Sequence, residues 1–160
     1  MKIWIWVFAI FFILVIQASL LPVLAFHGIR PDLVLTLVVS GSMLFGPEAG
    51  IGIGFFAGLL QDLAAANILG LNLIGKMAVG YLFGLLEKKV FKENLFVPAL
   101  AVFFATIIND AISFLFLAAI GYRLELSRAW LTGIGMSAAY NMIVAGPFYY
   151  LVLRVLARGR

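Results

Sequence analysis

Apolar residues fill six long stretches of the chain, and short polar or charged breaks separate these stretches. A helix that crosses a bilayer needs about 20 mainly apolar residues, and four of the stretches reach roughly that length. The pattern therefore predicts an all-α polytopic membrane protein, a bundle of about six transmembrane helices in a single integral membrane domain, residues 1–160. The apolar stretches are residues 3–26, 33–45, 49–60, 68–86, 96–120 and 129–156.

The second and third stretches are short for a complete crossing. They are separated by Gly46, Pro47 and Glu48. They form either two thin spans extended by their flanks or a re-entrant pair that enters the membrane and returns. A re-entrant backbone is tolerated only where it is buried in protein or lines a water-filled cavity. The sequence leaves both alternatives open.

Composition supports a membrane protein and excludes several other classes. The chain is 65% apolar and 11% charged, whereas soluble domains are roughly half apolar and a quarter charged. Cysteine is absent and histidine occurs once, which excludes disulfides, thiolate catalysis and cysteine-based zinc sites. The basic residues lie at helix ends and lack the interleaved aromatic residues of a nucleic-acid surface. We expect no enzymatic activity, no cofactor, no metal and no nucleic-acid partner.

The distribution of basic residues predicts the orientation in the membrane. Six crossings place both termini on one side, and cytoplasmic loops carry an excess of Lys and Arg. The side with the termini receives seven basic residues and the other side three, which predicts that both termini are cytoplasmic. The two sets are Lys2, Lys88, Lys89, Lys92, Arg154, Arg158 and Arg160 against Arg30, Arg123 and Arg128.

Glycines recur four residues apart in the third and fourth stretches. Gly50, Gly54 and Gly58 share one helix face, and Gly80 and Gly84 repeat the spacing. Glycine allows two helix backbones to approach closely in a membrane. The five glycines therefore form either an internal helix-packing surface or a docking face for another membrane protein.

Three ionisable residues, Asp62, Lys76 and Asp110, lie in or beside apolar stretches. A charge at the bilayer centre costs at least about 2.5 to 3.5 kcal/mol, so each residue needs a partner. With about 1.5 Å per residue, they lie roughly 6, 12 and 15 Å below the outer surface. We expect Lys76 to lie between the two carboxylates, in a structural ion pair or a ligand site. The amides expected nearby are Asn72, Asn109 and Asn141.

Arg30, Pro31 and Asp32 precede the second stretch and form a candidate helix-entry motif. Pro31 suits the start of a helix because its missing N–H would have no intrahelical partner. Asp32 adds a negative charge where the helix dipole is positive.

Several short motifs together resemble the rod shape-determining protein family MreD. They are residues 17–22 (QASLLP), 30–33 (RPDL), 54–62 (GFFAGLLQD) and 70–72 (GLN), followed by Gly80 and Tyr81. The chain length, the six apolar stretches and the basic C-terminal tail also fit this family. The resemblance extends over nearly the whole chain.

The resemblance implies a non-enzymatic subunit of the bacterial cell-elongation (rod shape) machinery in the cytoplasmic (inner) membrane, in contact with membrane lipid. It implies binding to MreC, a single-span periplasmic scaffold, with Gly50, Gly54 and Gly58 as our expected docking face. Through MreC, it implies contact with MreB and with the peptidoglycan synthase pair, RodA and a class B penicillin-binding protein.

The family is also similar in fold to the substrate-binding component of energy-coupling-factor transporters. This second similarity implies an alternative function, a small-molecule-binding transport subunit. Its expected ligand site is formed by Asp62, Lys76 and Asp110.

Overall fold

The computed structural model describes residues 3–19, 25, 29–66, 68–86, 96–122 and 128–156, and these residues form six helices without strands. The predicted all-α fold is confirmed. The helices are α1 (Ile3–Ser19), α2 (Leu33–Phe45), α3 (Pro47–Ala65), α4 (Leu71–Gly84), α5 (Phe96–Ala119) and α6 (Arg128–Leu156).

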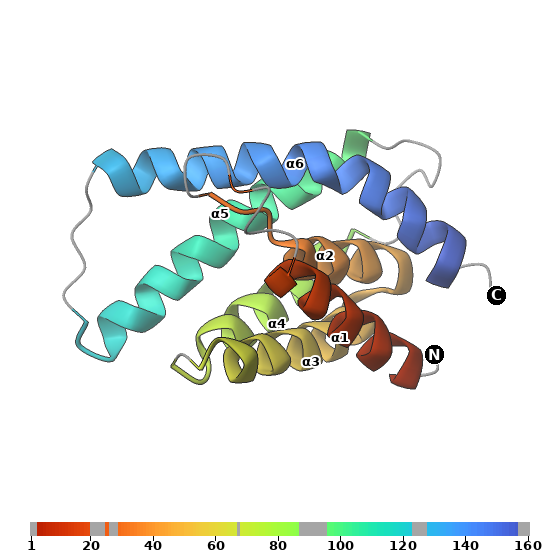
Figure 1. Ribbon diagram of the computed structural model, residues 1–160, viewed down its shortest axis with the longest axis horizontal. Helices are drawn as coiled ribbons and strands as arrows, with labels where there is room; N and C mark the ends of the chain where they lie inside the picture. Colours follow the sequence, from red (N-terminus) through yellow and green to blue (C-terminus); the bar gives the residue numbers. More distant parts are fainter. Residues whose placement is uncertain are drawn as a thin grey trace.

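Consecutive helices run in alternating directions along the long axis of the molecule (Figure 1). The start of α1 and the end of α6 consequently lie at the same end of the bundle. The long helices α5 and α6 lie on one side, and they diverge from each other toward the opposite end. This arrangement is the one expected of helices that are joined by short connections.

α1 is shorter than the apolar stretch that predicted it. The helix ends at Ser19, and Ala25 lies outside any helix. Residues 20–24 lie outside the described part of the chain. The first apolar stretch therefore contains a helix, as predicted, but the stretch is not helical at Ala25, close to its end at residue 26.

α2 is the central helix of the bundle. Every side chain from Val34 to Leu44 is buried, and the helix packs against each of the other five. A helix that is apolar on all sides is expected in such a position. With 13 residues, α2 is roughly 20 Å long, less than the roughly 30 Å hydrocarbon core. A helix this short can lie within the hydrocarbon core because protein, and not lipid, surrounds its backbone.

Gly46 forms the sharp connection between α2 and α3. Its φ of 89° is a conformation that residues with side chains rarely adopt. Its N–H donates to the carbonyl of Ser42 at 2.8 Å, and its carbonyl accepts from Gly50 N–H at 2.9 Å. Pro47 then occupies the first turn of α3, where no donor is needed. The predicted break at residues 46–48 therefore corresponds to a tight helical hairpin.

α3 and α4 are antiparallel and in backbone contact along their whole length. At each of five glycines, Gly50, Gly54, Gly58, Gly80 and Gly84, an added Cβ would lie within 2.2 to 2.4 Å of the other segment's backbone. These distances leave no room for any side chain. The contacts join Gly50 to the Gly80 carbonyl oxygen, Gly54 to the Lys76 carbonyl oxygen, Gly58 to the Leu73 Cα, and Gly84 to the Pro47 Cα.

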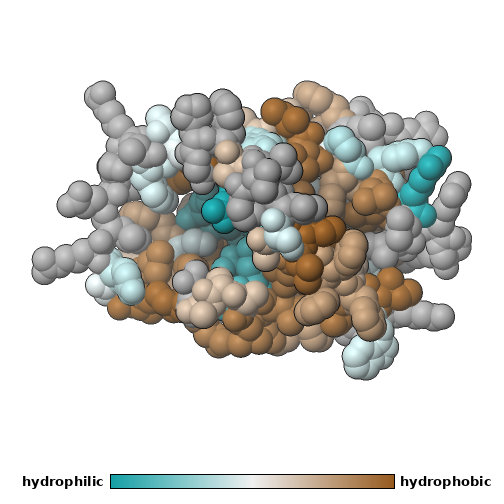
Figure 2. Space-filling view, in the orientation of Figure 1, coloured by the Kyte–Doolittle hydropathy of each residue, from teal (hydrophilic) through white to brown (hydrophobic). Residues whose placement is uncertain are grey.

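Two helices, α5 and α6, are long and apolar enough to cross a membrane. The shorter helices α1 and α2 are also apolar. Large apolar side chains on the outside are highly exposed, including Phe8 at 73% and Ile143 at 74%. Apolar residues cover much of the face seen in Figure 2, which also shows a hydrophilic hollow left of centre. A surface of this kind is expected where lipid surrounds the protein.

Candidate functional site

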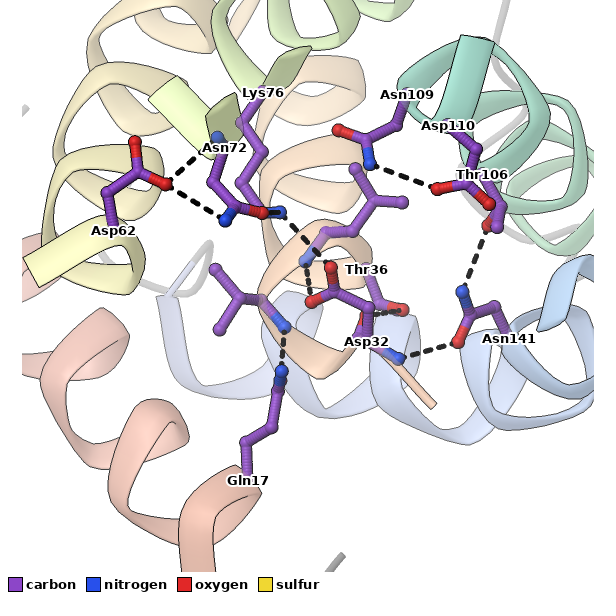
Figure 3. A network of polar contacts seen from close by, with 12 residues as sticks. Gln17, Asp32, Thr36, Asp62, Asn72, Lys76, Thr106, Asn109, Asp110 and Asn141 are labelled. Carbon is purple, nitrogen blue, oxygen red and sulfur yellow. Dashed lines mark hydrogen bonds and ion pairs between the residues drawn. The ribbon is translucent and has the colours of Figure 1, made fainter. Parts of the chain in front are cut away.

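Asp32 is the centre of a polar network between the helices (Figure 3). One carboxylate oxygen caps α2 by accepting a hydrogen bond from Leu35 N–H at 2.9 Å. The other oxygen lies 3.1 Å from Lys76 Nζ. The Asp32 backbone N–H donates to the side chain of Asn141 at 2.7 Å. Asp32 therefore joins the start of α2 to α4 and α6.

Lys76 is completely buried, and its ammonium group contacts Asp32 and Asn72. The distance from Nζ to the Asn72 side-chain oxygen is 3.1 Å. Lys76–Asp32 is the one ion pair among the described residues. We expected Lys76 between Asp62 and Asp110, but its partner is Asp32.

Lys76 does not pair with Asp62 because the carboxylate oxygens of Asp62 already accept other hydrogen bonds. They accept hydrogen bonds from the backbone N–H groups of Gly70 at 2.8 Å and Leu73 at 3.2 Å. The backbone and side-chain N–H groups of Asn72 donate to the same carboxylate at 3.0 and 2.9 Å. Asp62 thus satisfies the free donors at the start of α4, where the helix dipole also favours a negative charge.

Removing this cap is expected to weaken the α3–α4 unit. Asp62→Ala leaves three backbone donors at the start of α4 without their acceptor, which we expect to cost about 2 kcal/mol. Asp62→Asn keeps part of the acceptor capacity and should cost less. Thermal unfolding of the purified variants measures this difference, and equal stability of Asp62→Ala and the unchanged protein would contradict the capping role.

The α5 residues of the network form a second branch. Asn141 on α6 donates to the hydroxyl of Thr106 at 3.0 Å, and Thr106 donates to the carbonyl of Val102 at 2.9 Å. Asn109 donates weakly to the neighbouring Asp110 at 3.4 Å. This branch ties α5 to α6 and, through Asn141, to Asp32.

The structure therefore brings together most residues that the sequence singled out. Asn72, Lys76 and Asn141 belong to one network with Asp32, whereas Asp62 joins it through Asn72. Asp110 accepts from Asn109, interacts electrostatically with Lys76 and Asp32, and lines a cavity between α5 and α6. In the candidate helix-entry motif, Arg30 is exposed, Pro31 is buried and Asp32 caps α2.

Thr106 was not identified from the sequence, and the roles of two other residues in the network were not predicted. Gln17 near the end of α1 accepts from Val34 N–H at 3.2 Å, and Asp32 is the counter-ion of Lys76. The isolated amide of Gln17 in an apolar stretch was an available signal. Asp32 was identified only as a helix start, because it lies outside the apolar stretches.

The five candidate glycines, Gly50, Gly54, Gly58, Gly80 and Gly84, all lie in the contact of α3 with α4 and its flanking residues. The face that they share is thus occupied within the chain. It offers no space for the transmembrane helix of a second protein.

The chemistry of the network is that of a structural element. No group of three or more His, Cys, Asp or Glu side chains within the described ranges is arranged to hold a metal ion. The Lys76 amine and the carboxylates of Asp32 and Asp62 are bonded to each other, to Asn72 or to backbone donors. Such a network fixes which helices touch, since each member would be costly to bury alone.

Comparison with known proteins identifies the family. The family model described as rod shape-determining protein MreD matches residues 1–158. No curated protein and no solved structure matches the chain. MreD is a family of shape-determining structural proteins and is not a known enzyme family. Because the match extends over nearly the whole sequence, the chain belongs to the MreD family of rod shape-determining membrane proteins.

Proposed function

We propose that this chain is a multi-pass subunit of the bacterial cell-elongation machinery that holds MreC in the inner membrane. Through MreC it connects to MreB and to the synthase formed by RodA and a class B penicillin-binding protein. The family match along nearly the whole chain is the observation that carries this proposal. Its function is then to present a rigid surface, and no reaction is required.

The proposed topology has six membrane segments and cytoplasmic termini. The alternating helix directions in Figure 1 support it, because the start of α1 and the end of α6 lie together. The excess of Lys and Arg that the sequence has at the chain ends and in the segment between α4 and α5 supports the cytoplasmic assignment. Six of these seven residues lie outside the described ranges: Lys2, Lys88, Lys89, Lys92, Arg158 and Arg160. The short helix α2 would lie at membrane depth inside a ring of protein, as its complete burial requires.

The docking face for MreC is proposed on α6, since the glycines of α3 and α4 are occupied. Met136, Ala139, Tyr140 and Ile143 recur at helical spacing and line an apolar groove of about 420 Å³ together with Ile29. Residues spaced in this way lie on one helix face, and an apolar groove on such a face suits the apolar side chains of a partner helix.

Small residues beside the groove allow a helix to approach closely. Gly135 lies four residues before Ala139, and both are exposed. An added Cβ at Gly135 would meet no heavy atom within 4 Å. In membranes, small residues four apart are enriched where helices associate. This stretch of α6 therefore has the open small-residue surface that Gly50, Gly54 and Gly58 lack.

A matched pair of substitutions tests this assignment. Gly135→Leu is expected to fold normally and to lower co-purification with MreC by at least about tenfold. The control is Gly52→Leu on α3, because Gly52 also has no heavy atom within 4 Å of an added Cβ. Retained binding of MreC in well-inserted Gly135→Leu would remove α6 as the docking face.

The alternative function, a transport subunit with a ligand at Asp62, Lys76 and Asp110, has less support. Lys76 is fully buried and paired with Asp32, and Asp62 is bonded to the start of α4. A ligand would have to displace these internal partners. We therefore favour the scaffold function.

A further inference from the structure

A cavity of about 460 Å³ lies between α5 and α6, where the two helices diverge. Its volume is within the range of sites that hold small molecules. It is separate from the apolar groove that we assign to MreC, and the two cavities share no lining residue. The lining residues are Asp110, Ser113, Phe114, Leu117, Trp130, Gly133, Ile134 and Ser137.

Asp110 places a carboxylate at this cavity, and the one cation of the described residues whose charge acts on it, Lys76, is shared with Asp32, whose negative charge opposes that effect. Within the described residues, its one hydrogen bond comes from Asn109, at 3.4 Å. The buried amine of Lys76 is committed to Asp32. An ionised carboxylate inside a membrane protein requires a counter-charge, so the cavity favours a cation.

The other lining groups suit an ammonium group in particular. Phe114 on α5 and Trp130 on α6 meet with ring centroids 5.0 Å apart. Aromatic faces, tryptophan above all, attract cations. The hydroxyl groups of Ser113 and Ser137 line the same cavity. A primary ammonium has three donors, which match one carboxylate and two hydroxyls.

The remaining lining residues suit a hydrocarbon chain. Leu117 and Ile134 are apolar, and an added Cβ at Gly133 would meet no heavy atom within 4 Å. The cavity therefore combines a site for a cationic head with an apolar wall, at a position along two membrane-length helices.

We propose that the α5–α6 cavity binds a primary ammonium group, with Asp110 as its counter-ion and the aromatic rings of Trp130 and Phe114 in contact with its positive charge. This chemistry is available from the headgroup of an aminophospholipid or from a free alkylamine. The site does not depend on the proposed binding of MreC, because it lies on other residues.

Native mass spectrometry of the full-length protein tests the site. Phosphatidylethanolamine and phosphatidylglycerol are added at equal concentration, and the bound ratio is measured. We expect the protein to retain the ammonium lipid preferentially, and Asp110→Asn to lower the ratio by about tenfold. Glu48→Gln is the matched control, because it removes an exposed carboxylate from the start of α3 and should leave the ratio unchanged.

A second variant tests the cavity independently, so that the test remains valid even if Asp110→Asn does not fold. Gly133→Leu adds a side chain at a cavity-lining position without a backbone clash and should abolish retention, whereas Gly52→Leu on α3 should not. Loss of lipid retention at saturating ethylammonium would show that the ammonium group alone is sufficient for binding, and retention under that condition would show that the rest of the lipid is also needed. Equal lipid ratios in the unchanged protein, Asp110→Asn and Gly133→Leu would overturn the proposal.

Discussion

Gly54→Leu is expected to prevent α3 and α4 from packing and to destabilise the protein by more than about 3 kcal/mol. An added Cβ at Gly54 would lie 2.3 Å from the carbonyl oxygen of Lys76 and 2.7 Å from its carbonyl carbon. Both atoms are backbone, so no side-chain rotation relieves the clash. Thermal unfolding in detergent, followed by size-exclusion chromatography, measures the loss.

Gly52→Leu is the control for this prediction, since the same substitution there meets open space. Its effect should stay within about 0.5 kcal/mol, as is usual for surface substitutions. A stable, monodisperse Gly54→Leu protein would show that α3 and α4 do not touch as described. Loss of MreC binding by Gly54→Leu alone would carry no information on the docking face, because the bundle itself would be altered.

Lys76→Met is expected to destabilise the bundle by about 3 to 5 kcal/mol, the usual result when one partner of a buried ion pair is removed. The substitution leaves the Asp32 carboxylate, which is only 24% exposed, without its counter-charge. It also removes the Lys76 ammonium group, which donates a hydrogen bond to the side-chain oxygen of Asn72. Chemical unfolding in mixed micelles measures the change in free energy.

A double-mutant cycle separates the pair from the packing of the lysine stem. Asp32→Asn keeps the acceptor that caps α2, because asparagine is as good at this position as aspartate. The double variant Lys76→Met with Asp32→Asn should recover part of the lost stability, with a coupling of about 1 to 3 kcal/mol. Purely additive losses would mean that the contact at 3.1 Å contributes nothing to stability.

Hydrophobic pattern predicted the elements of this fold well, since apolar runs and polar breaks coincide with most helices and connections. The start of α2 at Leu33 and its end at Phe45 coincide with the ends of the second apolar stretch. α3 extends five residues beyond its apolar run, to Ala65. This extension places Asp62 inside the helix, where it reaches the start of α4.

The ion-pair partner of Lys76 could not be predicted from the sequence. Its partner lies 44 residues away, outside the apolar stretches, and three carboxylates were candidates for one amine. Only the packing of α4 across the start of α2 selects Asp32. The capping role of Asp62 was also not predicted. The residue before α4 is Gly70, which has no side chain to cap the helix, and this was the one available signal.

The spacing of the glycines likewise does not identify the helix that they contact. Four-residue spacing at Gly50, Gly54 and Gly58 indicates a close helix contact, but it does not say which helix makes that contact. The structure assigns α4, which repeats the spacing at Gly80 and Gly84. The open glycines of α6 were less prominent in the sequence, because they do not form a regular series.

Site-specific photo-crosslinking in intact membranes tests the central claim, binding of MreC to α6, most directly. A photoreactive residue replaces Met136 on the α6 groove or Phe104 on α5, two side chains that are each 54% exposed. The account predicts a crosslink to MreC from position 136 and none from position 104. Crosslinks of equal yield at both positions, or none at 136 while MreC is present, would contradict it.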